Sequence, residues 1–236
     1  MSYTSLQNYA ERKKQYLDAI RYYLSITNFK IVFVENSNTN ISYLFLDEIK
    51  KGRLECLTFQ GNQDKKRGKG FGECEIIKFA LENSVILRNS KKKRIVKITG
   101  RLIVRNLNIL IKVHCFLLPR KSIICAINSD LSFPDSRCII APASFYKKLL
   151  KRMFYIDDSL GYYFEHALLD TIKEEDSYHF YPFIIQPNIE GVSGSTGEIY
   201  KSYNHNIKQS FNYLRYAVSL RYRFQRRFRT NQCNYK

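Results

Sequence analysis

Glu165 and His166 have the most specific chemistry in this chain, because they place a carboxylate beside an imidazole. They follow an acidic loop with Asp157 and Asp158, and residues 135–170 read as strand, helix, loop and helix. A carboxylate or an imidazole within hydrogen-bond reach of a hydroxyl can remove its proton. We therefore expect Glu165 to be a general base, with His166 and Asp158 as alternatives. An aspartate that caps a helix is the simpler interpretation of the loop.

A glycine-containing loop, RGKGFGE at residues 67–73, combines an adaptable backbone with basic side chains. Glycine lets backbone amides approach a ligand closely, and the N-terminus of the helix that follows favours an anion. We expect Lys69 and Gly70 to bind a diphosphate here. The spacing fits neither a P-loop nor a dinucleotide-binding fingerprint, and a flexible surface loop is the alternative.

Polar side chains follow two predicted strands, at residues 29–34 and 95–99. In open α/β sheets, ligands bind at the carboxyl ends of strands. We expect a nucleotide there, with its base or ribose near the first strand and its phosphates near an arginine after the second. The alternative is an ordinary polar turn at each place. The predicted binding residues are Glu35, Asn36, Thr99, Gly100 and Arg101.

Three further residues complete the predicted site. Asp135 could offer its carboxylate to a divalent ion, Mg²⁺ or Mn²⁺, with help from Asp130, although a single carboxylate makes a poor site for either ion. Arg137 stands two residues later and is expected to contact substrate. Ser195 lies in a second flexible loop, residues 191–200, which could close over phosphates or a sugar. The alternatives are a turn aspartate and a plain linker.

The charge balance points to an anionic partner. The chain of 236 residues has 39 basic and 21 acidic residues, a formal net charge of +18. Nucleic acid, an anionic membrane and phosphorylated substrates all fit such a field. The six cysteines form no CxxC pair, so we expect reduced thiols. No stretch reaches the roughly 18 apolar residues that span a bilayer, and the N-terminus lacks the apolar run of a signal peptide, so we expect a cytoplasmic protein.

Periodicity predicts one α/β domain at residues 1–203, with a mixed, mostly parallel sheet flanked by helices. Helices are expected at residues 6–24, 41–50 and 71–87. Strands are expected at residues 29–34, 54–59, 95–99, 109–117 and 122–127.

Residues 204–236 form a separate basic segment, which we expect to be an amphipathic helix. Nine basic residues and no acidic residue follow Glu198. Such a helix is typical of a membrane surface, or its apolar side could pack on the core. Its predicted apolar side has Ile207, Phe211, Leu214, Val218, Phe224 and Phe228, and its basic side has Lys208, Arg215, Arg223, Arg226 and Arg227.

Four segments between residues 29 and 200 together resemble one family, the GT-A-fold glycosyltransferases of bacterial capsule and O-antigen biosynthesis. FKIVFVENS looks like the first nucleotide-binding strand and turn of that fold, and RGKGFGECEIIKFAL looks like the glycine-containing segment that leads a helix under the sugar nucleotide. IVKITGR stands where many members carry a strand and a DxD metal motif. FEHAL resembles the motif that supplies the base in inverting members. TGR replaces DxD here, so Arg101 and Lys69 could replace the metal ion.

The resemblance implies a nucleotide-sugar donor and a lipid-linked glycan or surface-polysaccharide acceptor. It also implies peripheral attachment to the inner face of the plasma membrane. Two alternatives come from other classes. A nucleic-acid-binding protein would use the +18 charge and the Arg, Tyr and Phe residues of the C-terminal segment. However, no recognition motif is present and the acidic loop would repel phosphate, so nucleic acid is not the expected partner. A non-catalytic membrane-surface scaffold is the other alternative.

Overall fold

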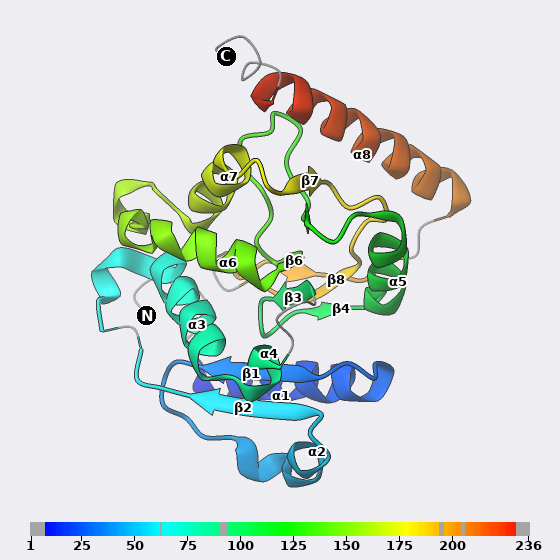
Figure 1. Cartoon of the computed structure of the whole chain (residues 1–236). Helices are drawn as coiled ribbons and strands as arrows, with labels where there is room; N and C mark the ends of the chain where they lie inside the picture. Colours follow the sequence, from blue (N-terminus) through cyan, green and yellow to red (C-terminus); the bar gives the residue numbers. More distant parts are fainter. Residues whose placement is uncertain (1–7, 62, 90–93, 194–195, 204–205, 230–236) are drawn as a thin grey trace.

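The structure is a computed structural model that describes residues 8–61, 63–89, 94–193, 196–203 and 206–229. The described residues form an α/β fold with three small sheets (Figure 1). The sheets have the strand orders β1-β2, β3-β6-β5-β7 and β4-β8-β9. Two strand pairs are parallel, β1–β2 and β5–β7, and the other four are antiparallel. The expected α/β class is confirmed, whereas these sheets are mixed rather than mostly parallel.

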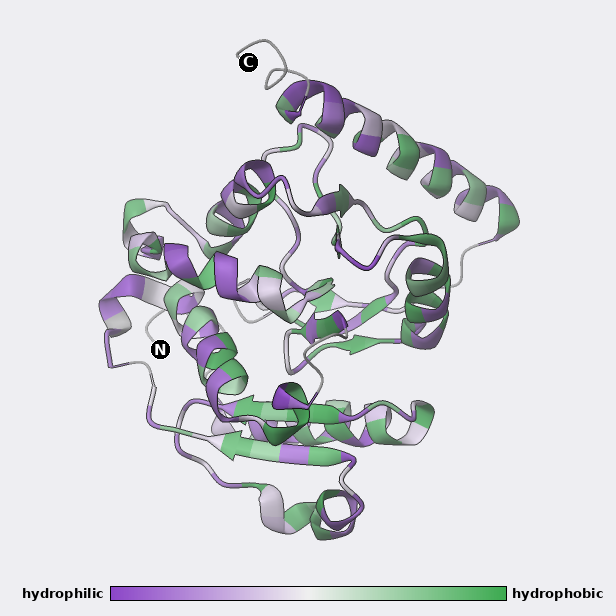
Figure 2. Ribbon diagram, in the orientation of Figure 1, coloured by the Kyte–Doolittle hydropathy of each residue, from purple (hydrophilic) through white to green (hydrophobic). Residues whose placement is uncertain are grey.

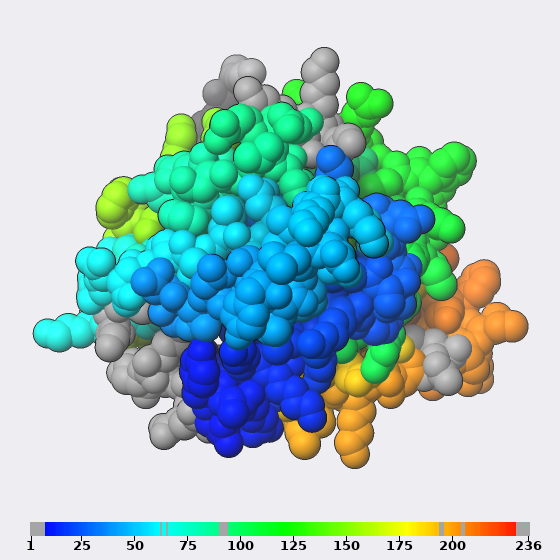
Figure 3. Space-filling view, turned by 90° about the horizontal axis from the view of Figure 1, so that it is seen from below, coloured from blue at the N-terminus to red at the C-terminus, as the bar shows by residue number. Residues whose placement is uncertain are grey.

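The first sheet lies at one end of the molecule and has its own core. Strands β1 (Ile31–Glu35) and β2 (Leu54–Thr58) are joined by a crossover through the short helices η1 (Ser42–Leu44) and α2 (Leu46–Lys50). Helix α1 (Tyr9–Ile26) packs along this sheet. Together, α1, β1 and β2 form much of the face seen in Figure 3. Their shared core contains Ile20, Phe33, Ile41, Phe45 and Leu54.

The four-stranded sheet is covered on both faces, as the alternation of its buried side chains requires. Ile139 packs in the core beneath α6, α7 and α8, whereas Ile140 packs in the core on the other face beneath α5. The strands are β3 (Arg94–Ile98), β5 (Ser122–Ile124), β6 (Cys138–Pro142) and β7 (His179–Tyr181). The third sheet has β4 (Ile103–Val104), β8 (Ile189–Val192) and β9 (Ile199–Tyr200).

The remaining helices connect and cover these sheets. Near the predicted site the segment order strand, helix, acidic loop, helix is confirmed, because β6 leads through α6 to α7. The helices are η2 (Lys65–Arg67), α3 (Gly68–Asn83), α4 (Val85–Arg88), α5 (Leu107–Leu117), α6 (Ala143–Leu149), η3 (Leu150–Tyr155), η4 (Asp158–Leu160), α7 (Phe164–Glu174) and α8 (Ile207–Phe228).

The strand predicted at residues 109–117 is wrong, because helix α5 occupies this segment. Its buried residues Leu107, Leu110 and His114 follow helical spacing, while Ile109 and Phe116 are exposed. A short apolar run rich in β-branched residues fits either structure, and only the packing decides between them.

Helix α8 lies along the outer edge of the molecule and alternates hydrophilic and hydrophobic residues (Figure 2). Ala217, Leu220 and Phe224 are buried, and the rings of Phe180 and Phe224 are 4.5 Å apart. Phe224 and Phe228 therefore face the core rather than sharing one apolar side with Ile207. Among the described helices, none is long and apolar enough to cross a bilayer.

Candidate functional site

Three cations from separate segments meet beside the first sheet, and we call them the cation cluster: Arg12 on α1, Lys69 at the start of α3, and Arg101 after β3. Burial lowers the pKa of Lys69, and the nearby charges of Arg101 and Arg12 lower it further, against the opposing effect of Asp158. Nε of Arg12 and both Nε and Nη1 of Arg101 are buried, with no hydrogen-bond partner among the described residues. The unsatisfied donors of Arg12 and Arg101, close to a third cation, form a site that is complementary to an anion.

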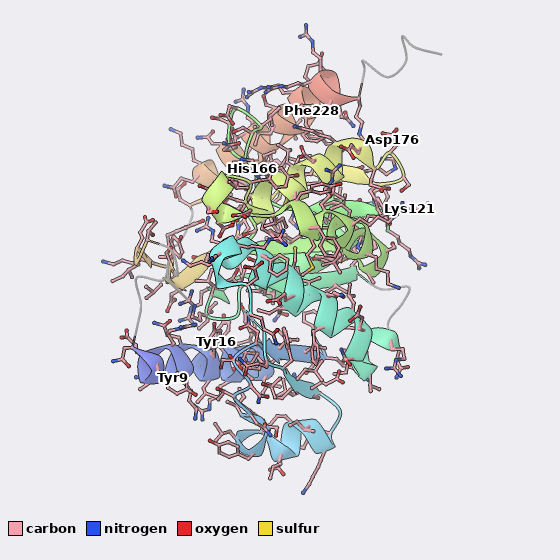
Figure 4. The ribbon with its side chains drawn as sticks, turned by 90° about the vertical axis from the view of Figure 1, so that its left-hand side faces the viewer. Tyr9, Tyr16, Lys121, His166, Asp176 and Phe228 are labelled. Carbon is pink, nitrogen blue, oxygen red and sulfur yellow. The ribbon has the colours of Figure 1, made fainter. Side chains whose placement is uncertain are left out.

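The TGR turn holds Arg101 in this position. The Thr99 nitrogen donates to the Arg137 carbonyl oxygen at 3.0 Å, and the Leu102 nitrogen donates to the Thr99 oxygen at 2.9 Å. A Cβ at Gly100 would lie only 3.0 Å from Tyr16 Cε1, so glycine lets the turn pack against α1. Figure 4 shows Tyr16 on α1 in the lower half of the molecule. Of the predicted turn residues, Arg101 is thus brought near the predicted Lys69, while Thr99 and Gly100 shape the turn.

The amides at the start of α3 are already occupied. The Lys69 and Gly70 nitrogens donate to Asp158 Oδ2 at 2.6 and 3.2 Å. Gly68 has a φ of +86°, and a Cβ at Gly70 would lie 2.8 Å from Asp158 Oδ1. These glycines therefore admit the Asp158 carboxylate, whereas we expected them to admit a ligand. Asp158 caps this helix, in line with the simpler interpretation of the acidic loop.

Polar atoms without partners also gather at the carboxyl ends of β1 and β2. Asn36 is only 6% exposed, and its Nδ2 has no hydrogen-bond partner in the described chain. Thr58 Oγ1, at the end of β2, also lacks a partner among the described residues, and so does Gln15 Oε1 on helix α1. Glu35 pairs with Thr58 in the sheet register, and its Oε2 accepts bonds from the amides of its own turn at 2.8 and 3.0 Å. Asn36 thus remains suited to a ligand, while the Glu35 carboxylate stabilises the turn.

A second group, which we call the carboxylate network, joins Glu73, Lys97, Ser136 and Glu165. Lys97 forms an ion pair with Glu73 and donates to the Ser136 carbonyl oxygen at 2.5 Å. The Ser136 hydroxyl donates to Glu165 Oε1 at 2.6 Å. Burial lowers the pKa of Lys97 to about 8, and the charge of Glu165 acts in the opposite direction. The Ser136 hydroxyl thus holds Oε1 of Glu165, the predicted base, in one position.

The cation cluster and the carboxylate network lie next to each other. Lys69 and Glu73 are four residues apart on α3, which places them on the same helical face. Lys97 and Arg101 belong to the same strand and turn, and Lys97 Nζ lies 3.4 Å from Thr99 Oγ1. The cation cluster and the carboxylate network together form a polar strip that reaches Glu165 on α7. Its other end lies near β1, since a Cβ at Gly100 would be 3.9 Å from Phe33 Cε2.

Sequence reasoning missed Arg12, Glu73, Lys97 and Ser136. Lys97 could have been found from the sequence, because it is a charged residue within a five-residue strand whose other central positions are apolar. Glu73 could also have been found, because it follows Lys69 by four residues. For Arg12, the sequence shows only that it shares a helical face with Tyr16.

Asp135 does not fit the role of a metal ligand here. Both of its oxygens accept hydrogen bonds from Arg137, at 2.6 to 3.0 Å. The guanidinium of Arg137 also lies 4.6 Å from the ring centre of Tyr200. Within the described ranges, no three His, Cys, Asp or Glu residues form a group that could hold a metal ion. The predicted substrate contact of Arg137 would have to form beside this ion pair.

His166 faces away from the carboxylate network. Its Nδ1 accepts a bond from the Tyr163 nitrogen at 3.1 Å, and its ring is stacked on Tyr162 and Tyr163. It lines a separate cavity of about 350 Å³ with Asp170 and Phe228, among others. Figure 4 shows His166 and Phe228 in the upper half of the molecule, apart from Tyr16. The predicted Ser195 lies outside the described residues.

Comparison with known proteins does not assign this chain to a group. No family model matches it, and neither a curated protein nor a solved structure shows significant similarity to it.

Proposed function

We propose that this protein is a nucleotide-sugar-dependent glycosyltransferase with a GT-A-like arrangement, acting on a surface polysaccharide or a lipid-linked oligosaccharide. The observation that carries this conclusion is the cation cluster of Arg12, Lys69 and Arg101, in which Arg12 and Arg101 have buried donors without partners among the described residues. Like charges held this close repel one another until an anion neutralises them. A diphosphate is an anion that arginine and lysine bind well.

The donor would lie along the polar strip. Its nucleoside would meet Asn36, Thr58 and Gln15, whose side chains have buried atoms in need of partners. Its diphosphate would lie between Arg101 and the other two cations. The sugar would then point along α3, from Lys69 towards Glu73, and so towards the carboxylate network.

This placement suits displacement of the diphosphate by an acceptor hydroxyl. The bond from the sugar's anomeric carbon to the phosphate oxygen breaks, and a bond to the acceptor oxygen forms. The cation cluster stabilises the negative charge on the departing diphosphate, a contribution that is often the largest in catalysis. In an inverting reaction, Glu165 takes the acceptor proton. Its Oε1 is held by Ser136, and no described residue hydrogen-bonds to its Oε2. A retaining reaction would not need this base.

Nucleic-acid binding is the competing function, and the location of the cations weighs against it. Side chains that contact a nucleic-acid backbone lie on an exposed face, whereas the partnerless atoms of Arg12 and Arg101 are buried among α1, α3 and the TGR turn. A mixed-sequence oligonucleotide should therefore bind elsewhere, if at all, and should leave these atoms unoccupied.

Thermal unfolding with a panel of nucleotide sugars tests the proposed function. A ligand present at 100 times its Kd stabilises a protein by about 2.7 kcal/mol. For a chain of this size that corresponds to a rise in Tm of about 5–10 °C. We expect at least one nucleotide sugar, and its nucleoside diphosphate, to give such a rise. Stabilisation by oligonucleotides alone would instead favour the nucleic-acid function.

A further inference from the structure

Helix α8 presents three distinct faces, which the spacing of about 100° per residue separates. One face is buried and carries Ala217, Leu220 and Phe224. A second, which we call the apolar stripe, is exposed and repeats at intervals of three and four residues. Its members are Ile207, Phe211, Leu214, Val218 and Tyr222.

The apolar stripe is unusually exposed for residues of this type. Ile207 is 85% exposed, Phe211 65% and Val218 58%. Single exposed apolar residues are common on protein surfaces, whereas a contiguous row along one helix marks an interaction surface. The buried face cannot explain the row, because it lies on a different side of the helix.

A basic row runs beside the stripe. Lys208, Arg215 and Arg226 are exposed and share the third face, which points directly away from the core. The helix has six basic residues and no acidic one. An apolar stripe next to a row of cations is the pattern of a helix that lies in the plane of an anionic lipid surface.

We propose that the apolar stripe and the basic row of α8 together dock this protein on an anionic lipid bilayer. The charge of α8 distinguishes between the partners that could cover its outer faces. A second copy of the chain would bring two basic rows together, which repels. Nucleic acid would satisfy the basic row but would leave the aliphatic residues Ile207, Leu214 and Val218 exposed. A lipid surface with anionic headgroups covers both faces.

The docked helix stays part of the folded molecule. Arg223 and Arg227 donate to the carbonyl oxygens of Ser129 and Asp130 at 2.5 and 2.7 Å. Arg221 lies 3.7 Å from the ring centre of Tyr181. Because these contacts fix α8 to the core, binding through its outer faces orients the whole protein on the bilayer. Removal of the helix would expose Leu220 and Phe224, so point variants are the better test.

Cosedimentation with vesicles that contain phosphatidylserine tests the docking directly. The double variant Phe211→Asp/Val218→Asp should lose more than about tenfold in vesicle affinity, because it puts charge on the apolar stripe. Its matched control, Ile109→Asp/Phe116→Asp, changes two similarly exposed residues of α5 and should bind like the wild type. The Lys208→Glu/Arg215→Glu variant should also lose binding, and the control Lys78→Glu/Arg88→Glu should lose much less. Binding should weaken steeply as salt rises.

Three results would overturn this inference. One is equal loss of binding in the α5 control and the α8 variant. Another is equal binding to neutral and anionic vesicles. The third is a wild-type protein that does not bind vesicles but sediments as a dimer, which Phe211→Asp/Val218→Asp converts to a monomer. Melting curves of each variant confirm that it is folded. Vesicle binding is measured without donor or acceptor, so the result is independent of the proposed enzymatic function.

Discussion

Lys97 and Glu165 are held by the same residue, Ser136. Its carbonyl oxygen accepts from Lys97 Nζ at 2.5 Å, and its hydroxyl donates to Glu165 Oε1 at 2.6 Å. A buried ammonium and a carboxylate are thereby fixed relative to each other, although they come from β3 and α7. Glu73 completes the arrangement as the ion-pair partner of Lys97. Such support is what a general base needs in order to keep one orientation.

We predict that Glu165→Gln lowers the rate of sugar transfer by at least about 100-fold, the usual scale for loss of a general base. Donor affinity should change little, because the proposed diphosphate contacts lie in the cation cluster. The change is small in volume, so the melting temperature should stay near that of the wild type. Turnover and donor affinity are measured separately, by product formation and by calorimetry.

Glu174→Gln is the control for this variant, because Glu174 lies on the same helix and pairs with Arg152 at the surface. It should keep normal turnover. Near-normal turnover in Glu165→Gln would remove Glu165 from the role of base.

We predict that Lys69→Ala and Arg12→Ala each weaken binding of a nucleoside diphosphate by about 10- to 100-fold, the range expected for a charged hydrogen bond. The bare nucleoside should bind both variants within about twofold of the wild type. The reason is that, in the proposed complex, these side chains contact the phosphates and not the base. Lys78→Ala on α3 and Lys14→Ala on α1 remove exposed lysines and serve as controls. Equal losses for diphosphate and nucleoside would contradict the assignment.

We predict that acid destabilises the protein partly through His114. This histidine is buried, its Nδ1 bonds to the Leu110 oxygen at 2.7 Å, and its Nε2 accepts from the Ile184 nitrogen at 2.9 Å. Burial lowers its pKa below the usual 6.5, so the unfolded chain binds a proton more readily than the folded one. Its stabilising contribution is therefore complete above about pH 6.5 and is lost as pH falls through the folded pKa.

Urea unfolding at several pH values measures this effect. Between about pH 6.5 and pH 5, the wild type should lose more unfolding free energy than His114→Gln, whose side chain does not titrate. Identical pH profiles for the two proteins would show that His114 does not titrate with unfolding.

The local features of the site could be predicted from the sequence, because each depends on a short segment. Strand β1 and its polar turn, the TGR turn and the start of α7 all follow from periodicity and breaker residues. The start of α3 does not, because this helix begins at Gly68, inside the segment that the sequence predicts to be a loop. The sequence singles out Lys69, Arg101 and Glu165 from such local patterns, and the structure places the first two in the cation cluster and Glu165 in the carboxylate network.

What could not be predicted depends on contacts between distant segments. Nothing local shows that Glu73 pairs with Lys97, or that Arg12 lies near Lys69. The occupation of the α3 amides by Asp158 also joins positions 89 residues apart. Helical spacing puts Phe211 and Phe224 on different sides of α8, but only packing shows that Phe224 is buried and Phe211 exposed. For α5, an apolar run fitted both a strand and a helix, and tertiary packing decided.

Calorimetric titration of a nucleoside diphosphate into the wild type, Arg101→Met and Arg88→Met tests the central claim most directly. Arg101 has buried donors without partners and Arg88 is an exposed arginine of α4, so the pair separates the site from general charge. We predict wild-type affinity in Arg88→Met and a loss of at least about tenfold in Arg101→Met, with both variants folded. Equal affinity in all three folded proteins, or no binding by the wild type to any nucleoside diphosphate, would contradict the account.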